Sequence, residues 1–353
     1  MNRILQLQRK IIPEGIELLE RRFTLLRTIQ SEQPIGRRTL AQRSGLTERV
    51  VRSETDYLKS RQFIDFVPRG MIMTLSGTDL LEELTAIMHD FLGLEEIAEV
   101  LRKSLHFKKV YVISGDSDEQ PETLDEMGRK SSELLARMMK QYSVVALTGG
   151  NTIKKMVEQF PASRNYPDVT VVPARGGVGR HYDIQANTLV GQLADKIGGN
   201  YRLLNLPDMI SEAALETMLK EKEVLETIRL IRQADVVVAG IGDAMTMARR
   251  RNLTEEETRE LRQAGAQGEF FGSYYNQSGQ IVKQNLAVGL SLADVRQSRE
   301  VIVLAGGSAK ARAILSVDFN ALGATLVTDE GAAREIIELS KDMAINQTTK
   351  ETL

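Results

Sequence analysis

Six short apolar runs, separated by amphipathic stretches, most constrain how this chain can fold from about Lys108 onward. The runs are rich in Val and Ile, several end in glycine, and they read KVYVISG, VVALTGG, VTVVPARGG, YRLLNLP, ADVVVAGIG and EVIVLAGG. Such runs are typical of strands buried on both faces of a largely parallel sheet. The pattern predicts an α/β, Rossmann-like doubly wound domain over residues 106–345, followed by a C-terminal tail at 346–353.

One loop of this domain has the features of a phosphate site. Ligands of doubly wound sheets bind at the carboxyl ends of the strands, where the glycine loops lie. In VVALTGGNTIKK a strand ends at Gly149 and Gly150, and Asn151 and Thr152 then open a helix. Exposed amides at a helix N-terminus favour an anion, and Lys155 adds a positive charge. A plain Gly-Gly turn is the alternative.

Three further strand ends carry charged residues beside glycines. Basic residues there could bind phosphate groups, and a carboxylate could bind a sugar hydroxyl group. The residues are Arg175 in PARGG, Asp243 and Arg250 in GIGDAMTMARR, and Lys310 in GGSAK. A solvated helix end is an equally good interpretation of Arg250. The second glycine-to-helix turn, at 306–308, suggests a ligand with two phosphate groups.

The N-terminal segment differs from the rest of the chain in charge. Residues 1–70 contain 14 Lys and Arg residues against 8 Asp and Glu residues, a net charge of +6, whereas the remainder carries −8. A basic N-terminal segment, here called the head, joined to an acidic remainder, here called the body, suggests a polyanionic partner for the head. A solvated basic surface with no partner is the alternative.

The pattern of the head predicts a winged helix-turn-helix over residues 1–76. Apolar residues recur at helical spacing over 15–31, and a short helix at 37–44, a turn at Gly45 and a longer helix at 48–61 follow. Thr47 is suited to cap the last of these helices. The segment FIDFVPRGMIMTLS then alternates as a β-hairpin does, which matches the wing. A helical protein–protein module is the alternative.

In a winged helix-turn-helix the second helix of the motif lies in the major groove of DNA. Arginine suits this surface because its planar guanidinium group can bind guanine edges or phosphate oxygens with two hydrogen bonds. The candidate base-reading residues are Thr47, Glu48, Arg49, Arg52 and Ser53, and the candidate phosphate contacts are Arg37, Arg38, Arg43 and Arg69.

The segment 77–105 between head and body has the apolar spacing of a coiled coil, from Leu80 to Leu105. Gly93 interrupts this pattern, so two helices are expected instead of one. A dimer of helix-turn-helix heads reads two half-sites, and an oligomerising connector would fit that arrangement. A helix packed on its own domain is the alternative for the part after Gly93.

Composition excludes several classes of function. The chain has no cysteine, which excludes disulfide bonds, zinc fingers and thiol catalysis. No run approaches the roughly 18 apolar residues of a membrane span, and the first residues lack the continuous apolar core of a signal peptide. A cytoplasmic protein with no membrane partner and no metal is expected. Of three histidines, only His181 is placed to serve an active site.

Several motifs together resemble the SorC family of bacterial sugar-responsive regulators over nearly the whole chain. They are the winged helix-turn-helix and the segments ALTGGNTIKKM, PARGGVG, VVAGIGDA, GEFFGSYYN and VIVLAGGSAKARAI. The resemblance implies an effector domain related in fold to sugar-phosphate isomerases and deaminases. Those deaminases carry a catalytic histidine soon after the glycines of the loop that matches GIGDAMTM, and residues 244–247 stand there instead. The resemblance therefore implies a sensor without a cofactor, and not an enzyme.

Within the family, the resemblance is strongest to repressors of glycolytic genes, and it implies fructose-1,6-bisphosphate as the inducer. The ligand residues it implies are Gly149, Gly150, Asn151, Thr152, Lys155 and Arg175 for one phosphate group, Arg250 and Lys310 for the other, and Asp243, Gln185 and Glu269 for hydroxyl groups. It also implies binding to double-stranded operator DNA as a homodimer or homotetramer. A family member with another sugar-phosphate effector and an active isomerase or deaminase are the alternatives.

Overall fold

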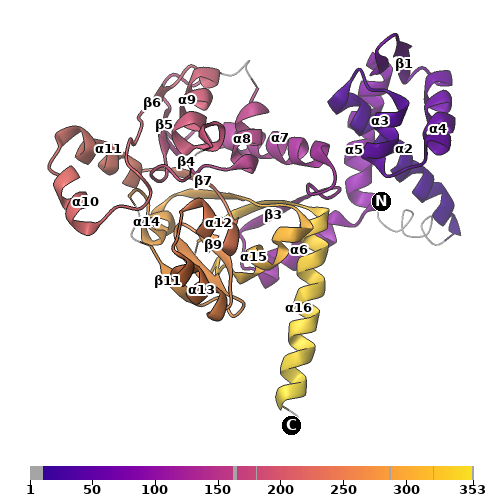
Figure 1. Ribbon diagram of the computed structural model, residues 1–353. Coiled ribbons are helices and arrows are strands. Elements are labelled where there is room, and N and C mark those ends of the chain that lie inside the picture. The colour runs from indigo at the N-terminus through magenta and orange to yellow at the C-terminus, as the bar shows by residue number, and fades with distance from the viewer. Residues whose placement is uncertain (1–10, 162–164, 180, 286–287, 321, 352–353) are drawn as a thin grey trace. The chain divides into compact units, whose positions relative to one another are not determined.

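The computed structural model describes residues 11–351 except 162–164, 180, 286–287 and 321, and at 86, 89–91, 212 and 343–351 it describes the backbone alone. The chain forms two compact units, whose elements are labelled in Figure 1. One unit extends to Glu96 and includes Gln120–Glu122, and the other comprises Ile97–Glu119 and the chain from Thr123 onward. The first ten residues, where no signal peptide is expected, lie outside the described residues.

The first unit has the predicted winged helix-turn-helix fold. Its elements are α2 (Pro13–Glu32), α3 (Arg37–Ser44), α4 (Glu48–Ser60), β1 (Ile64–Val67), β2 (Gly70–Met73) and α5 (Leu75–Phe91). The core lies where the helices meet, and Leu40, Val51 and Leu58 are at most 2% exposed. Ile35 exchanges two backbone hydrogen bonds with Met71, at 3.1 and 2.8 Å, and so adds a third short strand segment to the wing.

Local chemistry sets the turn between α3 and α4. Gly45 has a φ of 67°, in the left-handed region that glycine adopts without a steric cost, and its N–H donates to the carbonyl oxygen of Ala41. Thr47 then caps α4, because its hydroxyl oxygen accepts a hydrogen bond from the N–H of Val50 at 3.4 Å. Both roles were predicted from the sequence.

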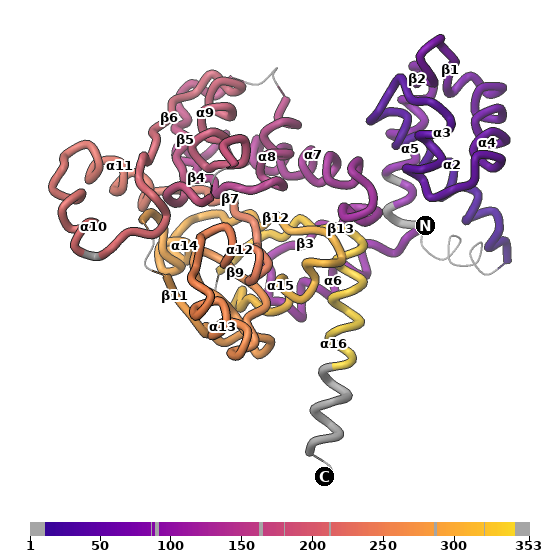
Figure 2. The backbone as a smooth tube through the Cα atoms, viewed as in Figure 1, coloured from indigo at the N-terminus to yellow at the C-terminus, as the bar shows by residue number. Residues whose placement is uncertain are grey.

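The centre of the second unit is a seven-stranded parallel sheet in the order β3-β13-β12-β7-β4-β5-β6. Its strands are β3 (Lys109–Ile113), β4 (Val144–Leu147), β5 (Thr170–Pro173), β6 (Asn200–Tyr201), β7 (Val236–Gly240), β12 (Glu300–Leu304) and β13 (Thr325–Asp329). Figure 2 shows α7 (Pro121–Met138), α8 (Asn151–Glu158) and α9 (Ala186–Ile197) on one side of the sheet. Val236, Val237 and Val238 of β7 are all 0% exposed, so both faces of the sheet are covered, which accounts for Val and Ile runs that do not alternate with polar residues.

The remaining helices of this unit are α6 (Leu94–Ser104), α10 (Glu212–Met218), α11 (Lys222–Arg232), α12 (Ala244–Arg250), α13 (Glu255–Gln263), α14 (Leu292–Gln297), α15 (Ala311–Ser316) and α16 (Glu330–Glu351). Two helices do replace one rod around Gly93, as expected, and Gly93 has a φ of 65°. Helix α16 extends into the segment 346–353 that the sequence predicted as a tail. The other predicted domain limits stay predictions.

Two features of the sheet were not predicted. The run YRLLNLP contributes only the two-residue strand β6 at the edge, and β13 was missed although it lies between β3 and β12. The sequence of β13, TLVTD, has few strongly apolar residues. Thr325, Thr328 and Asp329 are nevertheless at most 6% exposed, so polar residues occupy a central strand.

A second, antiparallel sheet was also missed, with the order β11-β10-β9-β8. Its strands are β8 (Gly242–Asp243), β9 (Ala266–Phe270), β10 (Ser273–Asn276) and β11 (Ile281–Gln284). The turn between β9 and β10 has positive φ angles at Phe271 (49°) and Gly272 (79°), as in a two-residue hairpin. Because the first turn residue is a phenylalanine and not Asn or Gly, the usual hairpin signal was absent.

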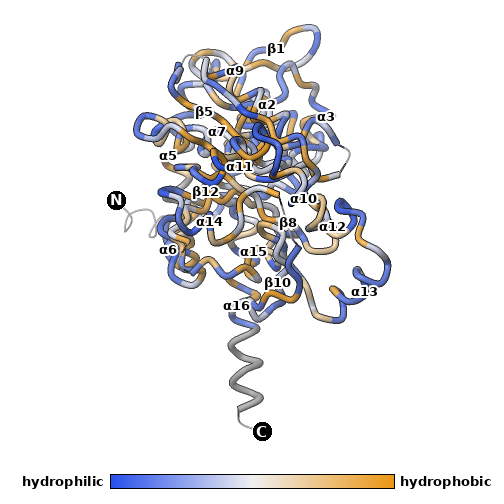
Figure 3. The backbone as a smooth tube through the Cα atoms, turned by 90° about the vertical axis from the view of Figure 1, so that its left-hand side faces the viewer, coloured by the Kyte–Doolittle hydropathy of each residue, from blue (hydrophilic) through white to orange (hydrophobic). Residues whose placement is uncertain are grey.

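Hydropathy along the backbone agrees with this arrangement. Figure 3 shows hydrophobic colour along β5 and hydrophilic colour along α13, whose sequence EEETRELRQ buries only Leu261. Among the described residues, every helix is either too short or too polar to cross a membrane.

The close approach of β9 to α15 generates a first prediction. A Cβ atom at Gly268 would lie 2.5 Å from the carbonyl oxygen of Ala313 and would also meet the hydroxyl group of Ser316. Because a helix backbone must move to relieve this clash, we expect Gly268→Ala to lower the free energy of unfolding by about 1–3 kcal/mol. Urea denaturation measures this.

The matched control is Gly191→Ala in α9, where a Cβ atom would meet nothing within 4 Å. The added methyl group should stabilise the helix by up to about 1 kcal/mol, because alanine loses less backbone freedom on folding. Similar unfolding midpoints for the two variants would show that the packing of β9 against α15 is loose.

Candidate functional site

A cavity of about 260 Å³ lies in the second unit at the carboxyl ends of β4, β5, β7 and β12. In the sheet, β4 and β7 are neighbours; β5 and β6 lie beyond β4, whereas β12 and β13 lie beyond β7. The strand order therefore reverses between β4 and β7, which is the point where open α/β sheets leave a crevice for ligands. The cavity lies at the strand ends where the sequence predicted a site.

The N-terminus of α8 forms one wall of the cavity. Gly149 allows the close approach of the loop opposite, since a Cβ atom there would lie 2.5 Å from the carbonyl oxygen of Ile184. Gly150 precedes the helix with a φ of 126°, and no side chain caps the helix. The first amides of α8, at Asn151 and Thr152, are therefore available to an anion. The sequence predicted all four residues, and all four line the cavity.

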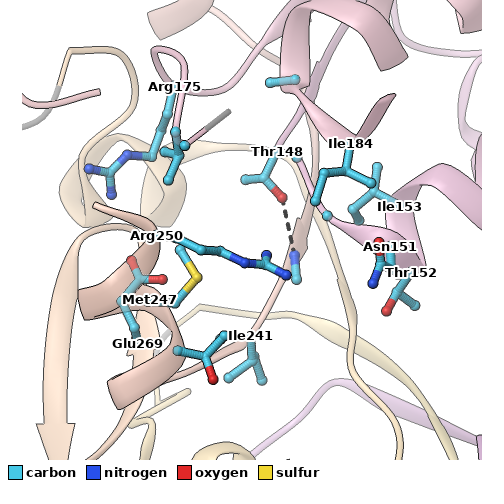
Figure 4. Close-up of a pocket in the computed structure, with 18 of the residues that line it drawn as sticks. Thr148, Asn151, Thr152, Ile153, Arg175, Ile184, Ile241, Met247, Arg250 and Glu269 are labelled. Carbon is cyan, nitrogen blue, oxygen red and sulfur yellow. Dashed lines mark hydrogen bonds between the residues drawn. The ribbon is translucent and has the colours of Figure 1, made fainter. Parts of the chain in front are cut away.

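Two cations also line the cavity. They are Arg250, the last residue of α12, and Lys310, which ends a short 3-10 turn before α15. Neither side chain forms a hydrogen bond or an ion pair within the described part of the chain. Figure 4 shows Arg250 extending across the cavity toward Thr148. Burial lowers the pKa of Lys310, the charge of Asp118 counteracts this, and Arg250 lowers the pKa further.

Directly next to Arg250, Arg251 has the opposite role and is part of a buried ion network. Its Nε donates to Asp208 at 2.9 Å and its Nη2 to Glu269 at 3.0 Å. The side chains of these three residues are 2–7% exposed. The Nη1 atom of Arg251 also lies 3.4 Å from the hydroxyl oxygen of Tyr274. The two carboxylates keep the pKa of Arg251 raised despite its burial.

Three residues predicted to contact sugar hydroxyl groups line the cavity but already have partners in the protein. Glu269 accepts hydrogen bonds from Arg251 and from the N–H of Gly272. Asp243 caps α12, because its Oδ1 accepts from the N–H of Thr246 at 2.8 Å. The amide group of Gln185 holds the loop at 178–179 through three hydrogen bonds. Each of these side chains therefore fixes the cavity wall as well as facing the cavity.

Two further residues that were predicted to bind the first phosphate group, Lys155 and Arg175, have protein partners instead. Lys155 is not among the residues that line the cavity, because its ammonium group lies 3.0 Å from Asp125 and 3.1 Å from Glu158. Arg175 does line the cavity, but its Nε donates to Asp208 at 2.7 Å. In Figure 4 its guanidinium group points away from Arg250.

Sequence reasoning missed Asp208 and Arg251. Asp208 follows the strand run YRLLNLP in a loop without any motif, so the sequence holds no signal for it. Arg251 belongs to the triplet Arg249–Arg251, in which successive helical residues point about 100° apart. The triplet shows that one arginine can face inward, but not which one.

The first unit presents a separate candidate surface on α4 and the wing. The predicted DNA-contacting residues that are exposed are Arg38, Arg43, Thr47, Glu48, Arg49, Arg52, Ser53 and Arg69. Arg49 and Arg52 are three residues apart, so they lie on one face of α4. Within the described residues, neither side chain forms a hydrogen bond or an ion pair, so both guanidinium groups are free for an external acceptor.

Two of the predicted phosphate contacts are instead paired within the unit. Arg37 forms an ion pair with Asp56, and its guanidinium carbon lies 4.7 Å from the centre of the Phe66 ring. Arg43 lies 2.9 Å from Glu32. Both residues link α3 to its neighbours, and this role reduces the charge that they can offer to DNA.

Two family models together match most of the chain. Residues 89–338 match the model described as "Putative sugar-binding domain", and residues 18–88 match that described as "CggR N-terminal DNA binding domain". The second match covers the winged helix-turn-helix, and the first covers the cavity.

Curated relatives are similar over almost the full length. The central glycolytic genes regulator of Priestia megaterium is 41% identical over 96% of this chain and 99% of its own, and that of Bacillus subtilis is 37% identical over the same shares. A solved structure, the "putative SorC family transcriptional regulator from Enterococcus faecalis", is 32% identical with a TM-score of 0.63, and covers 69% of this chain and 99% of its own. The full-length sorbitol operon regulator of Klebsiella pneumoniae shares the fold, with 17% identity and a TM-score of 0.61, over 89% of this chain and 97% of its own.

The contrast between the two neighbouring arginines generates a second prediction. Arg251→Ala leaves Asp208 and Glu269 as buried carboxylates without their shared partner, so it should lower the free energy of unfolding by about 3–5 kcal/mol. Arg250→Ala removes no contact within the described residues and should change it by about 0.5 kcal/mol or less. Chemical denaturation of both variants measures the difference, and equal losses would contradict this division of roles.

Proposed function

Because this chain belongs to the SorC family of sugar-binding transcription regulators, we propose that it represses glycolytic genes by binding operator DNA and that a sugar phosphate releases it. The sequence similarity to two proteins named central glycolytic genes regulators supports the choice of genes. Such a protein acts in the cytoplasm, as a homodimer or homotetramer that places two heads on two half-sites of the operator.

The observation that carries the effector part of this proposal is the charge of the cavity. Arg250 and Lys310 face a cavity that also exposes the first amides of α8, and neither cation has a partner among the described residues. Unpaired positive charge that is removed from water is costly, unless a bound anion compensates it. An anionic ligand is the simplest compensation, and the amides of α8 suit a phosphate group.

We infer fructose-1,6-bisphosphate as the effector. One phosphate group would bind to the amides of α8 at Asn151 and Thr152, and the other to Arg250 and Lys310. Asp243, Gln185 and Glu269 also line the cavity and offer oxygen atoms to sugar hydroxyl groups. The start of α12, where related deaminases carry a histidine, has Ala244 and Met247 here, which supports sensing over catalysis.

The ligand would act by linkage. It can shift DNA affinity only through a difference in its affinity for the two states of the assembly. A bisphosphate that contacts α8 and α12 together would draw the two walls of the cavity closer. For such systems the coupling free energy is about 1–3 kcal/mol, so we expect a fall in DNA affinity of about 5- to 150-fold.

The proposal is tested by fluorescence anisotropy of operator DNA, taken from the upstream region of the protein's own gene, at fixed salt. Salt is fixed because phosphate contacts make the affinity strongly salt-dependent. We expect tight binding that fructose-1,6-bisphosphate weakens and fructose-6-phosphate does not. Tight binding that is indifferent to the bisphosphate would leave a DNA-binding regulator with a different effector. Absence of DNA binding would overturn the repressor.

A third prediction concerns the DNA-reading surface. Arg52→Ala should weaken operator binding by about 1–3 kcal/mol, because it removes one bidentate arginine contact, and should leave sugar-phosphate binding unchanged. The matched control is Arg259→Ala on α13 of the second unit, which makes the same change of charge at an exposed position. Unchanged operator affinity in Arg52→Ala would remove this residue from the DNA contacts.

A fourth prediction concerns the effector. Arg250→Ala should keep operator binding but lose the response to fructose-1,6-bisphosphate, because one end of the cavity then lacks a phosphate partner. Arg249→Ala is the control, since that exposed neighbour bonds only to its own helix. Anisotropy titrations with both ligands show the difference, and a normal response in Arg250→Ala would place the ligand elsewhere.

A further inference from the structure

The turn at Gly306–Lys310, which the sequence suggested as a second anion site, is already filled by carboxylates of the protein. The N–H of Gly307 donates to Asp329 at 2.7 Å, that of Ser308 to Asp116 at 3.3 Å, and that of Ala309 to Asp118 at 2.9 Å. A ligand phosphate therefore meets no free amide among these three, and the turn itself is closed to it.

Gly307 allows the close approach of a carboxylate of the protein, and not of a ligand. A Cβ atom at Gly307 would lie 2.5 Å from Oδ2 of Asp118, so the carboxylate rests directly on the backbone of the turn. Gly307 has a φ of 92°, in the region where side chains are strained. Asp118 belongs to the loop at 114–119 that follows β3, and this loop is held in turn by a hydrogen bond from the N–H of Ser117 to Asp329.

The same turn presents Lys310 to the cavity. Its backbone N–H closes the turn on the carbonyl oxygen of Gly307 at 2.9 Å, and its side chain lines the cavity. The charged groups that act on its ammonium group are Asp118 and Asp329, which favour the charged form, and Arg250, which opposes it. Asp329 bonds to three backbone N–H groups, of Ser117, Gly307 and Ala332.

We propose that Asp118 is a positioning residue of the effector cavity, which holds the turn that carries Lys310 and keeps its ammonium group charged for the ligand. This inference rests on the proposed function, because it takes the ligand to be a phosphorylated sugar. It assigns the Lys310 end of the cavity to side-chain cations alone, whereas the α8 end uses backbone amides.

The physical need for such a residue follows from the surroundings of Lys310. Burial lowers the pKa of this ammonium group, and the neighbouring Arg250 lowers it further. A lower pKa reduces the fraction of lysine in the charged form, and a neutral amine attracts no phosphate group. A carboxylate behind the turn offsets both effects without entering the cavity, since Asp118 is exposed and does not line it.

The first test needs no sugar ligand. Lysine acetylation by acetic anhydride, read at Lys310 by mass spectrometry between pH 7 and 10, reports the fraction of free amine. Asp118→Asn keeps an acceptor for the amide of Ala309 but removes the charge. Lys310 should then react about threefold faster near pH 8, because a lower pKa leaves more of the free amine. Glu119→Gln, at the exposed neighbouring carboxylate, should change nothing. Equal reactivity of Lys310 in wild type and Asp118→Asn would overturn the proposal.

The second test uses fructose-1,6-bisphosphate and follows its affinity against pH by calorimetry. The affinity of wild type should fall as pH rises through the pKa of Lys310, because the ligand requires the charged form. In Asp118→Asn the fall should begin at lower pH, whereas Asp118→Ala, which also frees the amide of Ala309, should bind more weakly at every pH. An unshifted profile in Asp118→Asn would overturn the role of Asp118. Failure of wild type to bind the bisphosphate would contradict the proposed effector, and the acetylation result would then still decide the role of Asp118.

Discussion

The buried ion network around Arg251 is the interaction on which the cavity depends. Asp208 accepts from both Arg175 and Arg251, and Glu269 binds Arg251 and the hairpin turn at Gly272. Arg175 comes from the loop after β5, Asp208 from the loop after β6, Arg251 from the end of α12 and Glu269 from β9, so the network joins four segments of the chain. A guanidinium group that is shared between two buried carboxylates tolerates little displacement, because each lost hydrogen bond leaves a buried charge unpaired. The end of α12 is thereby held in one place.

Because Arg251 fixes the end of α12, the position of its neighbour Arg250 is fixed as well. Arg250 lies one residue earlier, on a different side of the same helix end, and extends into the cavity without a partner among the described residues. The helix end thus holds one arginine that is fully paired within the protein and one that has no partner among the described residues. Lys310 shows the same separation, since the carboxylates of Asp116 and Asp118 bind the backbone of its turn and leave its side chain free. In both places the surrounding groups are hydrogen-bonded within the protein, whereas the cation has no partner among the described residues.

The surface of the winged helix-turn-helix also carries both paired and unpaired arginines. Arg37 and Arg43 pair with Asp56 and Glu32 and link α3 to adjacent elements, whereas Arg49 and Arg52 on α4 have no partner among the described residues. Positive charge that is already paired adds little to the binding of a polyanion. Free guanidinium groups on one helix face are suited to reading bases. The net charge of the head therefore overestimates the positive charge that is available to DNA. Which arginines are paired within the protein determines where the available charge lies.

The sequence by itself determined the elements whose signals are local. Gly45 and Thr47 marked the helix-turn-helix, Gly93 marked the break in the connector, and Gly149–Thr152 marked the wall of the cavity, because backbone conformation and helix capping depend on near neighbours. The tertiary structure decided which charges are free. Lys155 is paired with Asp125, and Arg251 and not Arg250 is buried. The amides of Ser308 and Ala309 are bound by carboxylates from a loop nearly 200 residues earlier in the chain. Strand β13 was likewise recognisable only once its neighbours were in place. The physical reason is the same in each case, since the state of a charge or of a polar strand depends on the groups that folding brings beside it, and sequence distance does not encode them.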